Sequence, residues 1–432
     1  MRGPKNSSRR VAGRSGGVSE RRRLSSEEDD RPKLKMEKRE KQQDANEIGL
    51  SSAALSLPPE KLVALKEFKS RVAGLAPEEQ LQDHFLLQWL TARNFNVDKA
   101  ESMFKKSQDW HKELDMDHIL EWEAPEVLVK YVPQGCVGFD KFGGTVLIIP
   151  HGRVDIRGIL MSVTPTEHIK FTVQTIEKCK VMMAEESKRR GYPVCQQTCI
   201  FDLEGFSFKD FTWKPALESV IALMQVYEAN YPELLRVGYV INAPKIFTVA
   251  FTLVKPFLHE ATINKIKIFG RSGWQEEILQ DIDAEVLPKH WGGNRVDPDG
   301  NEMCPSLVCL GGAVPKEYYL KNKAKENRQH LTTITVPKGG NEKLSFTTTE
   351  PNSVIKWEFE TEDYDISFGI YKQDFPDDHL VAPHRVNSHL VPEEGEVVCP
   401  SPGTYIVQFD NSFSYLRAKK LHYSVAVLKP QN

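Results

Sequence analysis

Two acidic side chains at the end of a short apolar run are the first candidates for chemistry in this sequence of 432 residues. Asp202 and Glu204 follow the run "TCIF", a place where an α/β enzyme can hold a catalytic carboxylate. An enzyme would also need a nucleophile, a cofactor loop or a metal cluster beside them. The sequence contains no GxGxxG after a strand, no GxxxxGK[ST] and no HExxH. We therefore interpret the pair as a strand-end turn and predict no catalytic residues, no enzyme activity and no cofactor.

Histidines and cysteines with regular spacing are the second candidates. His379, His384 and His389 recur every five residues in a region that we expect to be a solvated loop. Cys195 and Cys199 form "CQQTC" without a second Cys or His pair nearby, which argues against zinc. We predict no metal site. The seven cysteines are an odd number and are typical of reduced thiols in a cytoplasmic protein.

An apolar run with a basic border is the third candidate, and its chemistry is binding. Nine uncharged residues extend from Ile246 to Val254, and Pro256 follows, which favours a helix that kinks or ends there. Basic residues outnumber a single acid, Glu260, around the run: Lys245, Lys255, Lys265, Lys267 and Arg271. Large apolar residues fall at helical spacing: Phe247, Ala250, Phe251, Val254, Phe257 and Leu258.

Such a helix is buried, lies on a membrane or faces something apolar, and plain burial is the default. Its place after a strand of an open sheet, together with the basic border, favours an anionic lipid surface or a lipid headgroup.

The elements that position this helix alternate between strands and helices. Short β-branched runs end in Gly or Pro at 144–150, 198–205, 237–244 and 265–270. One helix is expected from Thr164, as N-cap of a capping box, to about Arg190, and another over 214–230. The pattern predicts an α/β fold with a mostly parallel sheet covered by helices. The spacing of apolar residues predicts short helices over residues 55–120. After about residue 300, apolar residues occur at every second position, which predicts an all-β sandwich of about 110 residues.

The first 50 residues contain blocks of like charge and few large apolar residues, so we predict a disordered tail. This tail could be a nuclear address, a kinase target at Ser25 or a tether to anionic lipid, or it could have no role in the core function. The net charge of −3 argues against nucleic acid as a partner. The sequence has neither an apolar signal-peptide region nor a run long enough to cross a membrane. We expect a cytoplasmic protein that associates with membranes transiently.

The sequence resembles the CRAL-TRIO lipid-transfer family over roughly residues 55 to 430, in the supernatant protein factor or tocopherol-associated protein branch. The resemblance rests on "FLLQWLTARNF", "FDLEGFSF", "LPKHWGG" and "YPELLRVGYVINAPKIFTVAFTLVKPFLHEATINKIKIFG". The segment "HLVPEEGEVVCPSPGTYIVQFDNSFSYLRAKKLHYSVAVL" resembles a GOLD domain. The two resemblances together imply a helical CRAL-TRIO N-terminal lobe (55–120), a CRAL-TRIO lipid-binding domain (125–297) and a GOLD β-sandwich (315–430). The apolar run then matches the gate helix of a lipid cavity.

The resemblance also implies headgroup residues. In the phosphatidylinositol-transfer members an Arg, a Glu after "YP", a Thr and a Lys hold the inositol phosphate, and the matching positions are Arg93, Glu233, Thr262 and Lys265. The basic residue that follows that Arg in those members is Asn94 here. Other roles stay open: Arg93 and Glu233 could form an ion pair between lobes, Thr262 could cap a helix, and Lys265 could lie on a solvated strand edge.

The matching phosphatidylcholine subsite has lost its polar groups, since its places hold Gln197, Cys199, Leu147 and Ile149. Leu147, Ile149 and Cys199 are therefore expected to line an apolar cavity. This favours a neutral ligand, such as tocopherol or a squalene-like or retinoid-like isoprenoid, with phosphatidylinositol as a second, exchangeable ligand. Two functions remain in competition. One is lipid binding and transfer, and the other is a membrane-traffic adaptor whose GOLD domain recruits a protein partner. A third function, that of an enzyme acting on a lipid, is not supported, because the sequence shows no set of catalytic residues for it.

Overall fold

The computed structural model describes residues 57–324 and 330–430. The predicted disordered tail, residues 1–50, lies outside them. The chain divides into two compact units between Leu87 and Gln88, and each is described by itself.

The first unit is helical. It contains a helix, a 3₁₀ turn and the start of a second helix: α3 (Pro59–Val72), η1 (Glu78–Leu81) and the first turns of α4 (Asp83–Thr91). One stripe of α3 is buried, formed by Leu65, Phe68 and Val72, as helical spacing predicts. The Lys69 ammonium lies 2.7 Å from the buried carboxylate of Asp83.

The second unit begins with the end of α4 and further helical segments. These are α5 (Val97–Leu114), η2 (Met116–His118) and α6 (Glu126–Tyr131). The side chain of Asn96 caps α5 by accepting a hydrogen bond from the amide of Lys99. Asp115 ends the helix in the left-handed region, with its amide bonded to the last carbonyls. The helix starts and stops where local side chains satisfy its free backbone groups.

A five-stranded sheet forms the centre of the second unit. Its order is β1-β2-β3-β4-β5, with β1 antiparallel to β2 and the remaining pairs parallel. The strands are β1 (Gly135–Phe139), β2 (Thr145–Ile149), β3 (Gln197–Asp202), β4 (Leu235–Ile241) and β5 (Ile266–Ile268). The predicted mostly parallel sheet is confirmed.

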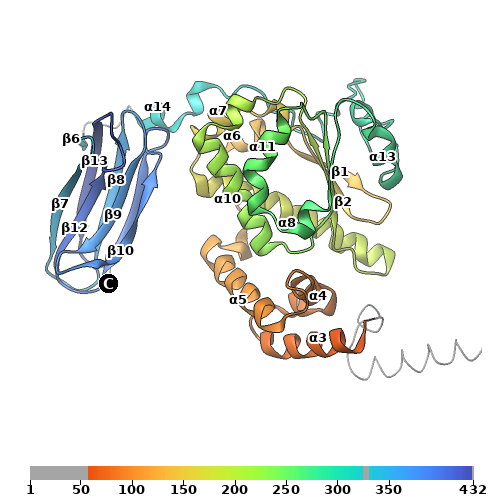
Figure 1. Ribbon diagram of the computed structural model, residues 1–432, viewed down its shortest axis with the longest axis horizontal. Helices are drawn as coiled ribbons and strands as arrows, with labels where there is room; N and C mark the ends of the chain where they lie inside the picture. Colours follow the sequence, from red (N-terminus) through yellow and green to blue (C-terminus); the bar gives the residue numbers. More distant parts are fainter. Residues whose placement is uncertain (1–56, 325–329, 431–432) are drawn as a thin grey trace, which may run out of the picture. The chain divides into compact units, whose positions relative to one another are not determined.

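Helices cover both faces of this sheet (Figure 1). Val146, Ile148 and Ile200 point to the face where Trp274 and Ile278 of α13 (Trp274–Asp281) pack. The alternate residues Leu147 and Cys199 point to the other face. That second face, here called the apolar face, meets Cys179 of α8 (Pro165–Arg190) and Tyr227 of α10 (Lys214–Asn230).

The two long helices have the predicted bounds. In α8 the Thr164 hydroxyl accepts from the amide of Glu167, and the Glu167 carboxylate accepts from the amide of Thr164. The shorter segments around them are η3 (His151–Arg153), α7 (Ile156–Leu160), α9 (Phe208–Phe211), α11 (Phe247–Val254), η4 (Lys255–Phe257), α12 (Glu260–Ile263) and η5 (Lys289–Trp291). No helix among the described residues is long and apolar enough to cross a membrane.

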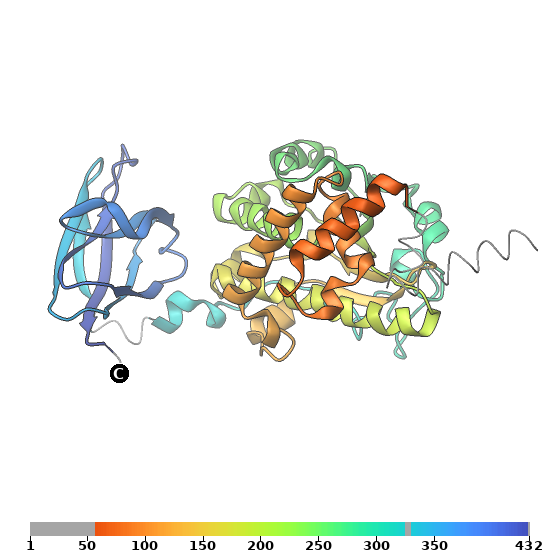
Figure 2. The ribbon, with the colours of Figure 1, turned by 90° about the horizontal axis from the view of Figure 1, so that it is seen from below.

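An all-β region follows the 3₁₀ turn η6 (Lys316–Tyr318) and the helix α14 (Leu320–Ala324). Two antiparallel four-stranded sheets enclose one apolar core. Figure 2 shows their strands in blue. Their orders are β10-β9-β12-β7 and β11-β8-β13-β6. The strands are β6 (Thr332–Val336), β7 (Asn341–Thr348), β8 (Ser353–Thr361), β9 (Ile366–Lys372), β10 (Phe375–Val386), β11 (Glu393–Cys399), β12 (Gly403–Asp410) and β13 (Lys419–Leu428). The predicted class, an α/β fold followed by an all-β sandwich, is confirmed.

One expectation about this region is wrong. His379 and His384 were expected in a loop, but they lie on the edge strand β10. The pairing of β10 with β9 is interrupted by register shifts, and most of its residues are exposed. An edge strand pairs on one side only, so it tolerates acidic residues and prolines that a central strand excludes.

Candidate functional site

Glu233 and Lys265 form an ion pair at one end of the sheet. The Lys265 ammonium donates to the Glu233 carboxylate at 2.7 Å, and both side chains are mostly buried. Glu233 lies in the turn after α10 with φ +58°, a left-handed conformation that is uncommon for this residue type. Lys265 lies just before β5, and its carbonyl accepts from the amide of Gly238 in β4. Backbone strain held in place by the fold is typical of functional sites.

Arg93 lies beside a histidine that the sequence did not single out. Its guanidinium donates to the Ala92 carbonyl at 2.8 Å and lies 3.4 Å from Nε2 of His259. The same His259 nitrogen is 3.6 Å from the carboxylate of Glu228. Arg93, His259 and Glu228 therefore form a chain of charged or titratable groups. The suggested ion pair between Arg93 and Glu233 is not formed, because Glu233 is paired with Lys265.

Thr262 belongs to the same neighbourhood but does not cap a helix. It lies inside α12, which begins just after His259, and its carbonyl accepts from the amide of Lys265 at 3.1 Å. The structure thus links Thr262 to Lys265 through the backbone and to Arg93 through His259. His259 and Glu228 could not be found from the sequence, because their role depends on which helices meet.

Arg93 also borders a pocket that is rich in cations. Lys99, Lys106 and Trp110 of α5 line it, together with Asn230 at the end of α10. Three cationic side chains around one pocket suit a phosphate or another anion.

The predicted cavity residues lie on the apolar face. Leu147 and Cys199 are buried, and Ile149 is partly buried and packs against them. Burial raises the pKa of the Cys199 thiol to about 12, so it stays protonated and acts as a small apolar group. Leu235 and Tyr227 complete this cluster. The face contains aliphatic, aromatic and thiol groups and offers no charge at its centre.

The predicted gate helix α11 is eight residues long and ends where Lys255 begins the 3₁₀ turn η4, which contains Pro256. Its inner side packs on α9 and α10: Ala250 and Val254 are buried, and Phe247 and Phe251 are partly buried. Leu258 is half-buried, whereas Phe257 is exposed. The outer side exposes between 37% and 49% of four large apolar residues, namely Ile246, Val249, Leu253 and Phe257. The helix is therefore apolar on two opposite sides.

The basic border of α11 is smaller than the sequence indicates. Lys265 is neutralised by Glu233, and Lys267 lies 3.0 Å from the carboxylate of Glu277. Lys245 and Lys255 remain exposed at the two ends of α11.

Asp202 holds the ends of two strands together. Its carboxylate accepts from the amide of Glu204, from the Asn242 side chain after β4 and from the Trp291 indole at 3.0 Å. Burial opposes its ionisation, but hydrogen bonds from His290, Asn242, Glu204 and Trp291 together lower the pKa of Asp202. Asp202, Glu204 and His290 also lie close enough to hold a metal ion. The hydrogen bonds of the Asp202 carboxylate give it a structural role without one.

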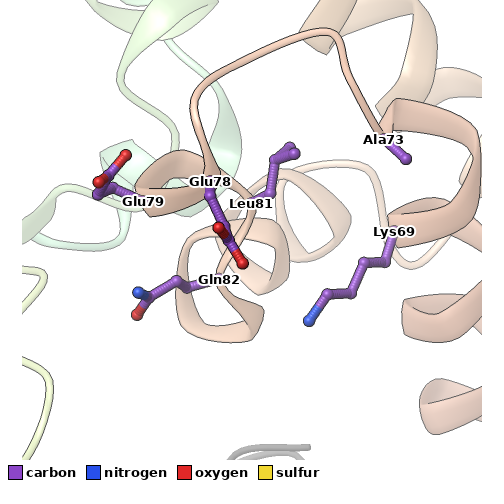
Figure 3. A pocket seen from close by; sticks show the side chains of 6 residues that line it. All are labelled: Lys69, Ala73, Glu78, Glu79, Leu81 and Gln82. Carbon is purple, nitrogen blue, oxygen red and sulfur yellow. The ribbon is translucent and has the colours of Figure 1, made fainter. Parts of the chain in front are cut away.

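A second pocket lies in the first unit and has a different character (Figure 3). Its lining side chains are mainly polar: Lys69, Ala73, Glu78, Glu79, Leu81 and Gln82. The Lys69 charge is already paired with Asp83, so two glutamates dominate the pocket. It suits neither an apolar chain nor a phosphate.

Comparisons with known proteins show a family model and two relatives that match this chain. Residues 130–293 match the family model of the CRAL/TRIO domain. The chain is 28% identical to "Protein ctg-1" of Caenorhabditis elegans over 387 residues, which are 88% of this chain and 99% of that protein. It is 30% identical to "Protein real-time" of Aedes aegypti over 332 residues, which are 74% of this chain and 50% of that protein. The chain thus spans half the length of the Aedes relative.

Among solved structures, the crystal structure of Sfh5 aligns with 62% of this chain and 97% of its own, at 16% identity and a TM-score of 0.47. The matched segment of the family model contains all five strands of the central sheet, the apolar face, α11 and the Glu233–Lys265 pair. The match to the family model therefore identifies a CRAL/TRIO domain at residues 130–293.

Proposed function

We propose that the protein takes a hydrophobic ligand between the apolar face and α10 and α11, and exchanges it with membranes by movement of α11. The candidate ligands are tocopherol, a squalene-like isoprenoid and phosphatidylinositol. One observation carries the proposal: α11 buries aromatic residues on its inner side and exposes apolar residues on its outer side. A helix with two apolar sides can exchange one apolar neighbour for another, here the protein interior for the acyl region of a bilayer.

The local structure of α11 suits movement. Its eight residues are fewer than an isolated helix needs for stability, and no side chain caps its first turn. It is held mainly by packing on α9 and α10. A segment held by few contacts opens at lower free energy than the core sheet does. The driving force for loading is the transfer of apolar groups from water, about 0.8 kcal/mol for each CH₂ group.

The charged groups near α11 suit a lipid headgroup. Lys265 and Glu233 form an ion pair at one end of the central sheet. Arg93 lies at a pocket that Lys99 and Lys106 also line. A phosphate diester could exchange its oxygens for the Glu233 carboxylate at Lys265. We therefore propose a headgroup site formed by Arg93, Glu233, Thr262 and Lys265 for phosphatidylinositol. Transient association with a membrane follows from the same residues, and we propose that the protein works in the cytoplasm.

Transfer between vesicles tests the proposal. Donor vesicles would contain tritiated tocopherol or tritiated phosphatidylinositol, and acceptor vesicles would be separated by density after incubation with the full chain. Transfer proportional to protein concentration is the expected result. Transfer rates equal to the spontaneous rates in buffer without the protein, for both lipids, would refute the proposed function.

The β-sandwich supports a second candidate function, that of an adaptor in membrane traffic. We propose that it is a GOLD domain and that it recruits a protein partner in response to lipid binding. Tyr415 and Leu416, in the connection between β12 and β13, are 84% and 87% exposed. Large exposed apolar residues on a loop suit a protein contact.

Deletion of the β-sandwich separates the two functions. The deletion should begin after Ala324, because the preceding segment packs on the CRAL/TRIO region. Val314 donates its amide to Asp155, Tyr318 donates to Glu126, and Leu320 donates its amide to Met161. Intact transfer in vitro with lost function in cells would favour the adaptor. Loss of transfer in vitro would favour a direct role of the sandwich in lipid exchange.

A further inference from the structure

His259 lies at the joint between α12 and the segment formed by α11 and η4. It comes two residues after η4 and stands at the N-cap position of α12. N-cap positions usually hold Ser, Thr, Asp or Asn, whose side chains accept a hydrogen bond from the helix. The His259 side chain makes no such bond, and its ring instead meets two groups from other parts of the fold. Those two contacts, and not its own helix, give the ring its role.

Arg93 is the first of these groups, and it selects the neutral form of the ring. Nη1 of Arg93 lies 3.4 Å from Nε2 of His259. A guanidinium only donates hydrogen bonds, so Nε2 must carry no proton in order to accept one. The same Nη1 also donates to the Ala92 carbonyl at 2.8 Å. In this state both hydrogens of Nη1 are used within the protein.

Glu228 is the second group, and it favours the protonated form of the ring. Its carboxylate lies 3.6 Å from the same Nε2, and its side chain is only 10% exposed. The carboxylate oxygen Oε1 is buried without a hydrogen-bond partner among the described residues. A buried carboxylate that lacks a partner gains from a cationic donor. A proton on Nε2 supplies that donor and removes the acceptor that Arg93 uses.

One proton therefore changes the partner of the ring. A neutral ring accepts from Arg93, whereas a protonated ring donates to Glu228 and repels the Arg93 guanidinium. Histidine is the side chain that ordinarily makes this change between about pH 5 and pH 8. The charged neighbours of His259 on its own segment, Lys255 and Glu260, are exposed and of opposite sign, so solvent screens them more strongly than Glu228.

Release of Arg93 by the ring bears on anion binding. Arg93 lines the pocket that Lys99 and Lys106 also line, and it belongs to the proposed headgroup site. A guanidinium holds a phosphate most strongly through two parallel hydrogen bonds, which require two free donors. While His259 and Ala92 both engage Nη1, this nitrogen has no donor left for a phosphate. Protonation of His259 makes one donor of Arg93 available.

We propose that His259 is a positioning residue whose protonation releases Arg93 to the phosphate of a lipid headgroup. The neutral ring holds Nη1 of Arg93, and the protonated ring pairs with Glu228. The proposal rests on the proposed function, because it describes the regulation of the headgroup site. It goes beyond that function by predicting that a lipid with an anionic headgroup is taken up better at acidic pH, whereas uptake of a neutral lipid does not depend on His259.

Uptake of two lipids at two pH values tests the proposal. The full chain is incubated at pH 7.5 and pH 5.5 with phosphatidylcholine vesicles that contain tritiated phosphatidylinositol or tritiated tocopherol, the vesicles are pelleted, and the lipid retained by the protein is counted. The phosphate diester keeps its single negative charge over this range, and neutral tocopherol corrects for other effects of pH on loading. We expect the ratio of phosphatidylinositol to tocopherol to rise about threefold or more on acidification, as one partly exposed charge contact allows.

Substitutions of His259 test the residue itself. His259→Gln can still accept from Arg93 but cannot gain a charge, so its ratio should stay low at both pH values. His259→Lys is charged at both and should give the high ratio at both, which a merely structural histidine does not predict. The side chain of His259 is 52% exposed, so both variants should fold. His118→Gln is the matched control, because His118 is also exposed and lies 2.7 Å from a carboxylate, that of Asp115; it should keep the wild-type dependence on pH.

The outcomes separate the proposal from the function on which it rests. A ratio that does not rise when the wild-type chain is acidified would overturn the proposal while leaving lipid uptake in place. A rise that persists in His259→Gln would also overturn it, because another group would then titrate, and so would a low ratio for His259→Lys at both pH values. Failure of the wild-type chain to retain either lipid at either pH would contradict the proposed function itself.

Discussion

Replacing two outward-facing residues of α11 gives a quantitative test of its proposed contact with membranes. Val249 and Leu253 are 49% and 41% exposed, so together they present roughly the equivalent of one fully exposed apolar side chain. Moving such a side chain from water into an apolar phase is worth about 1.5–3 kcal/mol. The double variant Val249→Ser/Leu253→Ser should therefore bind vesicles about 10- to 100-fold more weakly than the wild-type chain.

Co-sedimentation with phosphatidylcholine vesicles measures this binding directly. A lipid titration gives the partition coefficient, and repeating it at high salt removes the contribution of exposed lysines such as Lys245 and Lys255. The matched control is Val129→Ser/Val181→Ser, which alters residues of α6 and α8 that are 55% and 45% exposed. This control removes a similar apolar area from elsewhere on the chain and should leave binding unchanged.

Membrane contact through α11 is contradicted if the α11 variant sediments with vesicles as strongly as the wild-type chain. It is also contradicted if the control variant weakens binding to the same extent, because exposed apolar area in general, and not α11, would then determine partition. Near-native circular dichroism of both variants is required, and it is expected because all four side chains are between 41% and 55% exposed.

Three further predictions follow from the same structure. Phe251→Asp should abolish lipid loading by placing a charge against α9 and α10, while Thr252→Asp, on the exposed side, should not; equal transfer by both would contradict the orientation of α11. Lys265→Met should reduce uptake of phosphatidylinositol about 10-fold or more and leave uptake of tocopherol unchanged, and an equal loss of both would show a structural role of the pair with Glu233. Burial lowers the pKa of His168 to about 4, so the unfolded chain binds more protons between about pH 6.5 and pH 4, and stability falls as the pH falls through this window. Between pH 7 and pH 5 the free energy of unfolding in urea should fall by about 2 kcal/mol more for the wild-type chain than for His168→Gln, and an equal fall in both chains would refute the assignment.

Local sequence signals predicted the long helices well. The capping box of Thr164 and Glu167, with Pro165 at the first helical position, fixes the start of α8, and Gly191 ends it in the left-handed region. These signals act within one turn of the chain and need no information about tertiary contacts. The short β-branched run that ends at Pro150 likewise indicated a strand, although it could not show which face of the strand would meet α8 and α10.

The backbone explains one departure from the family pattern. Asn94, at a position where the resemblance implies a basic residue, has φ +51°, and Phe95 after it has φ +60°. Asn tolerates the left-handed region better than most residues because its short side chain can bond locally. The choice of Asn at this position therefore has a structural reason, independent of any headgroup.

Partners across the fold could not be predicted. The sequence allowed an ion pair between Arg93 and Glu233, but Glu233 pairs with Lys265 and Arg93 lies beside His259. Glu228 joins this group only because the end of α10 faces the turn before α12. Which charged groups meet depends on how helices pack, and side-chain type and spacing along the chain do not determine that.

The most direct test of the central claim is the lipid content of the protein itself. The full chain would be purified from cells without detergent and extracted with organic solvent, and the extract would be quantified by mass spectrometry against the protein concentration. We expect close to one bound lipid for each chain, drawn from a few neutral species and phosphatidylinositol, and we expect Phe251→Asp to abolish this binding. Extraction of no lipid above the level of a non-binding control protein, with no uptake from vesicles, would contradict it.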